Sequence, residues 1–227
     1  MADTYTRPTY YLDADNPAVV SFARQAAGED SSRRQRAVRL YYAVRDGFRY
    51  NPYAFSMDKT KYQASYTLAA GEGFCVQKAI LLAAAARAAA IPARLGFANV
   101  RNHLATERLK ALMGTDLFVF HGYTELLIDG RWVKATPAFN LSLCEKFDTR
   151  PLEFDGRADS IFHPFDNLGR KHMEYVHDYG SFDDFPYDRM VEEFRRYYTV
   201  WFNDDVDIDF DGIGGDFERE REQDRGR

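Results

Sequence analysis

The chain has few cysteines, no excess of basic residues and no long apolar segment. Its 227 residues include only two cysteines, Cys75 and Cys144, so a disulfide framework is not expected to hold the fold, and both should remain thiols in a reducing compartment. The formal net charge is -5. A protein without a basic surface lacks the contacts that phosphate backbones require, so we expect no nucleic-acid partner.

Membrane signals are also missing. No stretch reaches the length of uncharged apolar sequence that spans a bilayer. The first 17 residues contain acidic side chains and an early proline but no apolar run, which is unlike a secretory signal or a membrane anchor. We therefore expect no membrane partner and a cytoplasmic location.

The composition is that of a globular protein with many aromatic rings. Hydrophobic residues make up 45% of the chain and aromatic residues 15%, which is enough to build one sizeable core. We expect one domain over residues 1–202. Residues 203–227 are acidic and then mixed in charge, with little to bury, and are expected to form a tail.

Capping residues and periodicity predict several helices. Asn16-Pro17 is a typical helix start and Gly28 a typical end. The segment from Cys75 to Ala90 is apolar on nearly all sides, which predicts a buried helix that Pro92 stops. Residues 48–73 have no clear period and are expected to be rich in loops. The other helices are expected over residues 32–46 and 188–202, with a short one between 104 and 113.

The strongest β signal is LFVFHGYTELLI followed by Asp129-Gly130 and RWVKAT. Asp-Gly between two such runs is typical of a two-residue hairpin turn. In that register Glu125 faces Lys134 and Tyr123 faces Thr136. With a further strand at 93–97, the pattern predicts an α+β fold in which helices pack on an antiparallel sheet.

Cys75 is the candidate nucleophile because it begins the predicted buried helix. Free backbone N–H groups and the helix dipole favour an anion there, so a lowered thiol pKa is expected. Gly71 and Gly73 just before it would allow a substrate to approach the backbone closely, and the Cys75 N–H is placed to donate to an oxyanion. The alternative is an inert thiol buried in the core.

His121, in the first strand of the hairpin, is the candidate base. A single histidine in a strand is more often structural. Spacing alone does not choose among the five histidines, and the other four are His103, His163, His172 and His177.

Two segments resemble the transglutaminase-like superfamily. GFCVQKAILLAAAARAAAIPARLGF, residues 73–97, is similar to its Gly-x-Cys helix and Ile-Pro-Ala-Arg strand entry, and HGYTELLIDGRWVKATPAFN, residues 121–140, is similar to its histidine hairpin. The resemblance implies a papain/transglutaminase-like core over about 30–140, with the nucleophile at the N-terminus of a buried helix. It also implies that Cys75, with His121 as its base, attacks an amide or isopeptide bond of a peptide or protein, as a hydrolase or a transferase, without a cofactor.

The chain departs from the family at the third catalytic position. The family's aspartate before proline is Thr136 here, and a hydroxyl offers no counter-charge to an imidazolium. Asn140 is the first alternative for orienting His121 and Asp155 the second. The substitution keeps open a degenerate relative that binds peptides or proteins without turnover.

Two more features of the sequence are open to a functional interpretation. Upstream of Cys75 only Tyr66 and Thr67 stand out as oxyanion donors, and neither is assigned that role. Aromatic residues from Phe48 to Tyr66, with Trp132 and Phe139, are expected either to wall an acyl-binding groove or to pack in the core.

The C-terminal region contains a calcium-loop pattern. Asp207, Asp209, Asp211, Gly212 and Glu218 match D-x-D-x-D-G-x5-E, whose oxygen ligands suit Ca²⁺. Gly214 stands where an aliphatic residue is usual, and the ERERE segment after the loop has no apolar face. A solvated acidic tail is therefore the competing interpretation.

Overall fold

The computed structural model describes residues 4–28, 32–103, 105–162, 167, 169, 172–202 and 213–220. Its helices are α1 (Pro17–Ala27), α2 (Arg33–Gly47), α3 (Ala64–Ala70), α4 (Cys75–Ala88), α5 (Glu107–Met113), α6 (Leu141–Phe147) and α7 (Tyr187–Tyr197). Its strands are β1 (Arg49–Tyr50), β2 (Glu72–Gly73), β3 (Ala93–Asn102), β4 (Leu117–Ile128), β5 (Arg131–Ala135) and β6 (Met173–Phe182). Two 3-10 turns, η1 (Thr4–Thr6) and η2 (Lys59–Tyr62), complete the elements of these described ranges.

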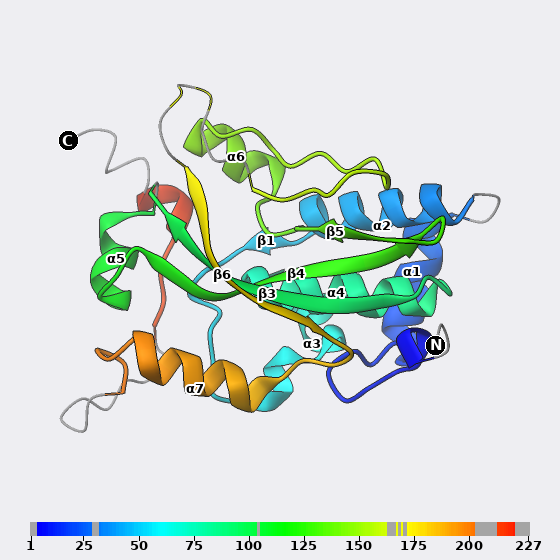
Figure 1. The fold of residues 1–227 in the computed structure, drawn as a ribbon, viewed down its shortest axis with the longest axis horizontal. Helices are drawn as coiled ribbons and strands as arrows, with labels where there is room; N and C mark the ends of the chain where they lie inside the picture. Colours follow the sequence, from blue (N-terminus) through cyan, green and yellow to red (C-terminus); the bar gives the residue numbers. More distant parts are fainter. Residues whose placement is uncertain are drawn as a thin grey trace.

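The main sheet has the strand order β5-β4-β3-β6, and all its pairings are antiparallel. Within the hairpin Glu125 lies opposite Lys134, as the sequence predicts. Pairing continues to Thr124 opposite Ala135, one step short of Tyr123 and Thr136. Helices packed on this sheet confirm the predicted α+β class (Figure 1).

Helix α4 runs between the sheet and the other N-terminal helices (Figure 1). Each of its residues from Cys75 to Arg87 is buried, because alanine side chains let the helix lie close to β3 and β4. The buried Lys78 ammonium donates to the carbonyl groups of Arg45, at 2.9 Å, and Phe48, at 2.6 Å. Burial lowers the pKa of Lys78 to about 7. These bonds tie α4 to the C-terminal end of α2, so the head of α4 has a fixed place.

Side-chain caps explain why the first two helices begin where the sequence predicts. The Asn16 side chain accepts from the Ala18 N–H at 3.0 Å. Ser32 and Gln35 form a reciprocal capping box at the start of α2. Each cap satisfies N–H groups that the helix itself leaves unpaired.

Other elements differ from the prediction. The region 48–73, expected to be rich in loops, holds α3 and the short parallel pair β1–β2. Strand β3 extends to Asn102, and α7 ends at Tyr197 rather than at residue 202. Helix α6 and strand β6 were not predicted. β6 is largely exposed, so its sequence lacks the apolar alternation that marks a half-buried strand, and pairing with β3 holds it in the sheet.

The described part of the C-terminal region packs on the domain. Phe217 is buried and its ring packs against two others. Its ring centroid lies 5.9 Å from that of Tyr50 and 4.9 Å from that of Phe147. Glu218 pairs with Lys146 at 2.6 Å. Residues 213–220 therefore differ from the expected solvated tail, because one aromatic ring gives them apolar surface to bury.

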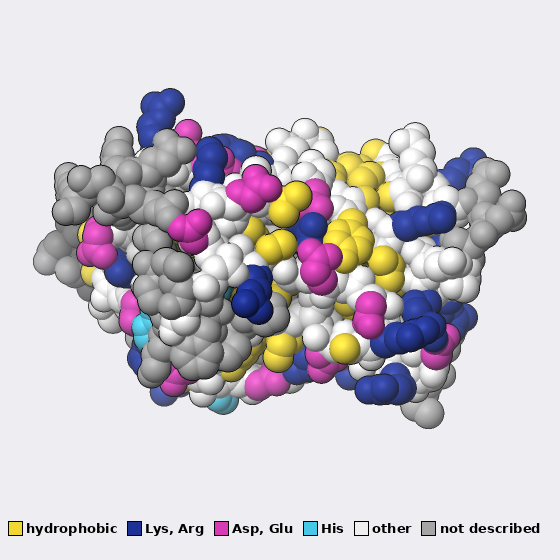
Figure 2. Space-filling model, turned by 90° about the horizontal axis from the view of Figure 1, so that it is seen from above, with side chains coloured by type: hydrophobic (Ala, Val, Ile, Leu, Met, Phe, Trp, Pro, Cys, Tyr) yellow, Lys and Arg dark blue, Asp and Glu magenta, His cyan; other side chains and the backbone are white. Residues whose placement is uncertain are grey.

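No helix in the described ranges is long and apolar enough to cross a membrane. Figure 2 shows basic and acidic side chains on the same face, interspersed with hydrophobic ones. That face carries charges of both signs rather than one continuous basic surface.

Contact between β4 and the head of α4 depends on Gly122. A Cβ atom there would lie 2.9 Å from the Val76 Cα and 3.4 Å from the Cys75 carbonyl oxygen. We expect Gly122→Ala to lower the free energy of unfolding by about 1–3 kcal/mol, because backbone cannot yield as a flexible side chain can. Urea denaturation measures the change. Gly47→Ala is the matched control, since a Cβ at Gly47 would meet nothing within 4 Å, and equal stabilities of the two variants would contradict this account.

Candidate functional site

Cys75 is held at the head of α4 by the segment that precedes it. Gly71 ends α3 in a left-handed conformation with φ of 71°. Gly73 pairs with Tyr50 in the β1–β2 ladder, and a Cβ at Gly73 would lie 3.0 Å from the Gln77 side chain. Within the structure the two glycines therefore serve a turn and a close packing contact.

The Cys75 thiol is buried among backbone donors. Its residue is 5% exposed, and the N–H groups of Gly122, Val76 and Cys75 itself favour the thiolate. Burial outweighs them and raises the pKa of Cys75 to about 12. The lowered pKa expected from the helix head is therefore wrong for this conformation, because removing the thiolate from water costs more than three N–H dipoles return.

His121 lies on β4 beside the same backbone. The His121 ring packs edge-on against that of Phe162, with the ring centroids 5.0 Å apart, whereas its neighbour Gly122 packs closely against Val76 and Cys75 at the head of α4. Burial lowers the pKa of His121 to about 3. Neither imidazole nitrogen has a hydrogen-bond partner within the described residues. The thiol and the imidazole thus come from adjacent parts of one strand-helix contact, but no hydrogen bond joins them here.

A backbone irregularity lies directly before His121. Phe120 has φ of 59°, a strained value for a bulky residue. The β3–β4 register shifts between Ala98 and Val100, and the Asn99 side chain accepts the Phe120 N–H at 3.0 Å. Such bulges redirect the following side chain, and the conformation of Phe120 was not foreseen from the sequence.

The Thr136 hydroxyl does not pair with the imidazole. Thr136 is buried, lies beside the Tyr175 hydroxyl, and its oxygen has no hydrogen bond of normal geometry in the described part of the chain. Its backbone is fixed, because its N–H donates to the Ser160 carbonyl at 3.1 Å. Thr136 is therefore in the expected part of the hairpin but does not orient His121 in this conformation.

The two alternatives for the third position are engaged elsewhere. Asn140 accepts from the Tyr50 N–H at 3.0 Å and donates to the Ser142 hydroxyl at 2.7 Å. The exposed Asp155 accepts from the N–H groups of Arg157 and Ala158. The Asn140 carboxamide thus joins β1 to the start of α6, and the Asp155 carboxylate stabilises its own turn.

The other histidines have different surroundings. His103 lies 3.7 Å from Glu174, and the exposed His177 packs against Tyr179. His172 is buried near Phe139 and Phe162, and His163 lies outside the described residues. Tyr66 lines a polar chamber further from the thiol, and Thr67 is fully buried.

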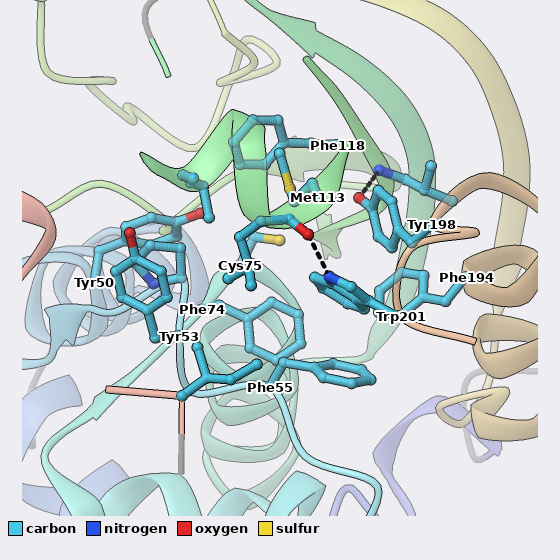
Figure 3. Close-up of a pocket in the computed structure, with 15 residues that line it drawn as sticks. Tyr50, Tyr53, Phe55, Phe74, Cys75, Met113, Phe118, Phe194, Tyr198 and Trp201 are labelled. Carbon is cyan, nitrogen blue, oxygen red and sulfur yellow. Dashed lines mark hydrogen bonds between the residues drawn. The ribbon is translucent and has the colours of Figure 1, made fainter. Parts of the chain in front are cut away.

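An apolar pocket opens beside Cys75. Figure 3 shows the thiol pointing into the space between Phe74, Met113 and Trp201. The pocket has a volume of about 50 Å³. Of the aromatic residues expected to wall a groove, Tyr50, Tyr53 and Phe55 line it, whereas Trp132 packs under Arg94 and Tyr5 and takes no part.

A second chamber of about 210 Å³ adjoins the apolar pocket. The two share Tyr53, Phe55 and Ile213 as a common wall. Polar side chains line the second chamber, among them Asn51, Ser56, Lys61, Glu72 and Gln77.

The described residues hold no group of three or more side chains suited to a metal ion. Of the calcium-loop residues, Asp207, Asp209, Asp211 and Gly212 lie outside the described part of the chain, and Glu218 pairs with Lys146. The calcium site stays a prediction.

Fold and sequence define the class together: an α+β protein with a cysteine at the head of a buried helix and a histidine on the adjoining strand. The family model of the transglutaminase-like superfamily matches residues 20–137, and the chain belongs to that superfamily. This confirms the resemblance drawn from its two motif segments.

A solved structure also aligns with part of this chain. The crystal structure of "a Putative Cysteine Protease from Cytophaga hutchinsonii" aligns with 21% identity and a TM-score of 0.45, over 59% of this chain. The match spans 40% of that protein's chain. The comparison with curated proteins gave no match.

Proposed function

We propose that this protein is a cysteine-dependent acyl-transfer enzyme that acts on an amide or isopeptide bond of a peptide or protein. The observation that carries the proposal is the place of the Cys75 thiol. It lies against the backbone N–H of Gly122, the residue that follows His121 in β4, and it lines the apolar pocket.

The shifted pKa values define the resting state. With the thiol pKa near 12 and the imidazole pKa near 3, both groups are neutral at pH 7. Neutral imidazole is the form that accepts a proton. The pair therefore starts as thiol and base rather than as an ion pair.

The reaction then proceeds in two balanced steps. As Cys75 sulfur bonds to the carbonyl carbon, its proton passes to His121, and the imidazolium returns that proton to the leaving nitrogen as the carbon–nitrogen bond breaks. Water, or a second amine, then attacks the thioester carbonyl and gives a proton to His121. The carbon–sulfur bond breaks, and the Cys75 sulfur takes that proton back from the imidazolium. Because no hydrogen bond joins the pair at rest, His121 must turn toward the thiol when substrate binds, as catalytic hydrogen bonds often tighten only in the complex.

Trapping the thioester tests the proposal. Incubation with p-nitrophenyl acetate should add one acetyl group to the peptide that contains Cys75 and none to the peptide that contains Cys144, as measured by mass spectrometry. Cys144→Ala should be acylated like the wild type, and Cys75→Ala should not be acylated. Cys144 is a suitable control because it is also buried, and burial raises its pKa as well.

A degenerate relative that binds peptides without turnover is the second candidate. The unpartnered imidazole and the hydroxyl at Thr136 favour it, because nothing among the described residues stabilises an imidazolium. Equal, slow acylation of both cysteines in a folded protein would support this candidate and exclude the enzyme.

A further inference from the structure

The shape and chemistry of the apolar pocket beside Cys75 limit which acyl groups the thiol can receive. Its lining comes from the loop after β1, the heads of α4 and β4, the end of α5, and α7 with the residues that follow it. The lining side chains are mostly aromatic or aliphatic, among them Phe55, Phe74, Met113, Phe118, Tyr198 and Trp201. None of these side chains is charged.

On the wall formed by Tyr198 and Trp201, the polar side-chain atoms are already bonded within the protein. The Tyr198 hydroxyl accepts from the Val119 N–H at 2.7 Å and donates to the Leu117 carbonyl at 3.1 Å. The Trp201 indole donates to the Leu112 carbonyl at 2.7 Å (Figure 3). A polar or charged substituent directed at this wall would lose its water without gaining a partner, which is costly.

The size of the pocket further limits the acyl chains that it can hold. Its volume of about 50 Å³ is about a third of the roughly 150 Å³ apolar cavity that accepts a benzene molecule. Met113 and Trp201 close it on the side that the thiol faces (Figure 3). A short aliphatic chain fits this space, whereas an aromatic ring needs one of these side chains to move.

We propose that Cys75 accepts an acyl group whose chain is small, aliphatic and uncharged, and that this chain occupies the apolar pocket. The inference rests on the proposed function and deepens it. The Cys75 S–H and an acyl donor R–CO–X give the thioester R–CO–S and H–X: a sulfur–carbon bond forms, the carbon–X bond breaks, and the thiol proton goes to X. In the thioester the R chain starts two bonds from sulfur, so it must lie where the thiol points.

Four p-nitrophenyl esters test the proposal: acetate, butyrate, hydrogen succinate and phenylacetate. Succinyl matches butyryl with a carboxylate in place of the terminal methyl, so the pair isolates charge. We expect butyrate to acylate Cys75 at least about 100-fold faster than succinate and about tenfold faster than phenylacetate. Each rate is measured by mass spectrometry and divided by the rate of the same ester with N-acetylcysteine, which removes the intrinsic reactivity of the ester.

Met113→Ala supplies a second readout. Removing this side chain enlarges the pocket beside the thiol, so the ratio of the butyrate rate to the phenylacetate rate should fall about tenfold. A ratio of two rates on one preparation does not depend on how much of the variant is folded. An unchanged ratio would mean that the acyl chain lies elsewhere.

The outcomes separate this inference from the proposed function. If Cys75 is acylated but succinate reacts as fast as butyrate, the pocket does not hold the acyl chain and the enzyme proposal stands. If none of the four esters acylates Cys75 faster than Cys144, both proposals are wrong.

Discussion

Replacing His121 with alanine is expected to lower the rate of Cys75 acylation at pH 7 by about 10³-fold. Burial holds the pKa of the thiol near 12, so without a base almost none of it is ionised at neutral pH. General-base catalysis contributes about 10²–10⁴-fold in rate, and this thiol depends on it more than an exposed one. Acylation by p-nitrophenyl butyrate, followed by mass spectrometry, measures the loss.

The pH dependence distinguishes a base from a structural residue. With a pKa near 3, His121 is a neutral base throughout pH 5–8, so the wild-type rate should be flat there. In His121→Ala only the thiolate reacts, and its fraction rises about tenfold per pH unit below the thiol pKa. The ratio of wild-type to variant rates should therefore fall about 10³-fold between pH 5 and pH 8.

Two other histidines provide controls. His172→Ala removes a second buried imidazole from the same aromatic cluster, and His177→Ala removes an exposed one. Both variants should keep the flat profile. A profile in His172→Ala that rises with pH would give the role of base to His172, and a flat profile in His121→Ala would exclude His121.

The parts of the fold that local chemistry determines were predictable from the sequence. Asn16 and Ser32 cap their helices, and Asp129-Gly130 forms the hairpin turn that sets Glu125 opposite Lys134. The apolar run after Cys75 predicted a buried helix, and it is one. Each of these signals lies within a few residues of the structure it determines.

Features that depend on distant partners were not predictable in this way. β6 is stabilised by its pairing with β3 about 80 residues earlier in the chain, and its sequence alone carries no strand pattern. Phe217 becomes a core residue only because Tyr50 and Phe147 meet it. At the site, a helix head suggested a thiol with a low pKa, but the pKa depends on how completely the surrounding chain excludes water, and that requires the fold.

The resting state of the site should also limit the stability of the protein in acid. In the unfolded chain His121 has its ordinary pKa of about 6.5, and in the folded chain burial lowers it to about 3. As pH falls below about 6.5, His121 becomes protonated in the unfolded state but stays neutral in the folded state. The free energy of unfolding therefore falls until pH reaches about 3. At pH 4.5 the loss from this residue amounts to about 2–3 kcal/mol.

His121→Phe is the matched variant for testing this loss of stability in acid, because it keeps an aromatic ring against Phe162 but cannot titrate. Urea unfolding at pH 7 and pH 4.5 should show a smaller loss in this variant than in the wild type by about 2–3 kcal/mol. The difference between the two pH values excludes any constant effect of the new ring on packing. Equal losses would mean that His121 is protonated in the folded state, and hence that water or an acidic partner reaches it.

Cys75 should lower the stability of the protein at alkaline pH. Its pKa rises from an ordinary value of about 9 to about 12 on folding, so the unfolded chain loses its proton first as pH rises through 9, and stability falls from there toward pH 12. The loss should be smaller in Cys75→Ala than in the wild type by about 2 kcal/mol between pH 8 and pH 10.5. Parallel curves would show that the thiol is not desolvated, which would remove the reason for its dependence on His121. The same burial that makes a neutral pair the resting state therefore confines the highest stability of the protein to a range around neutral pH.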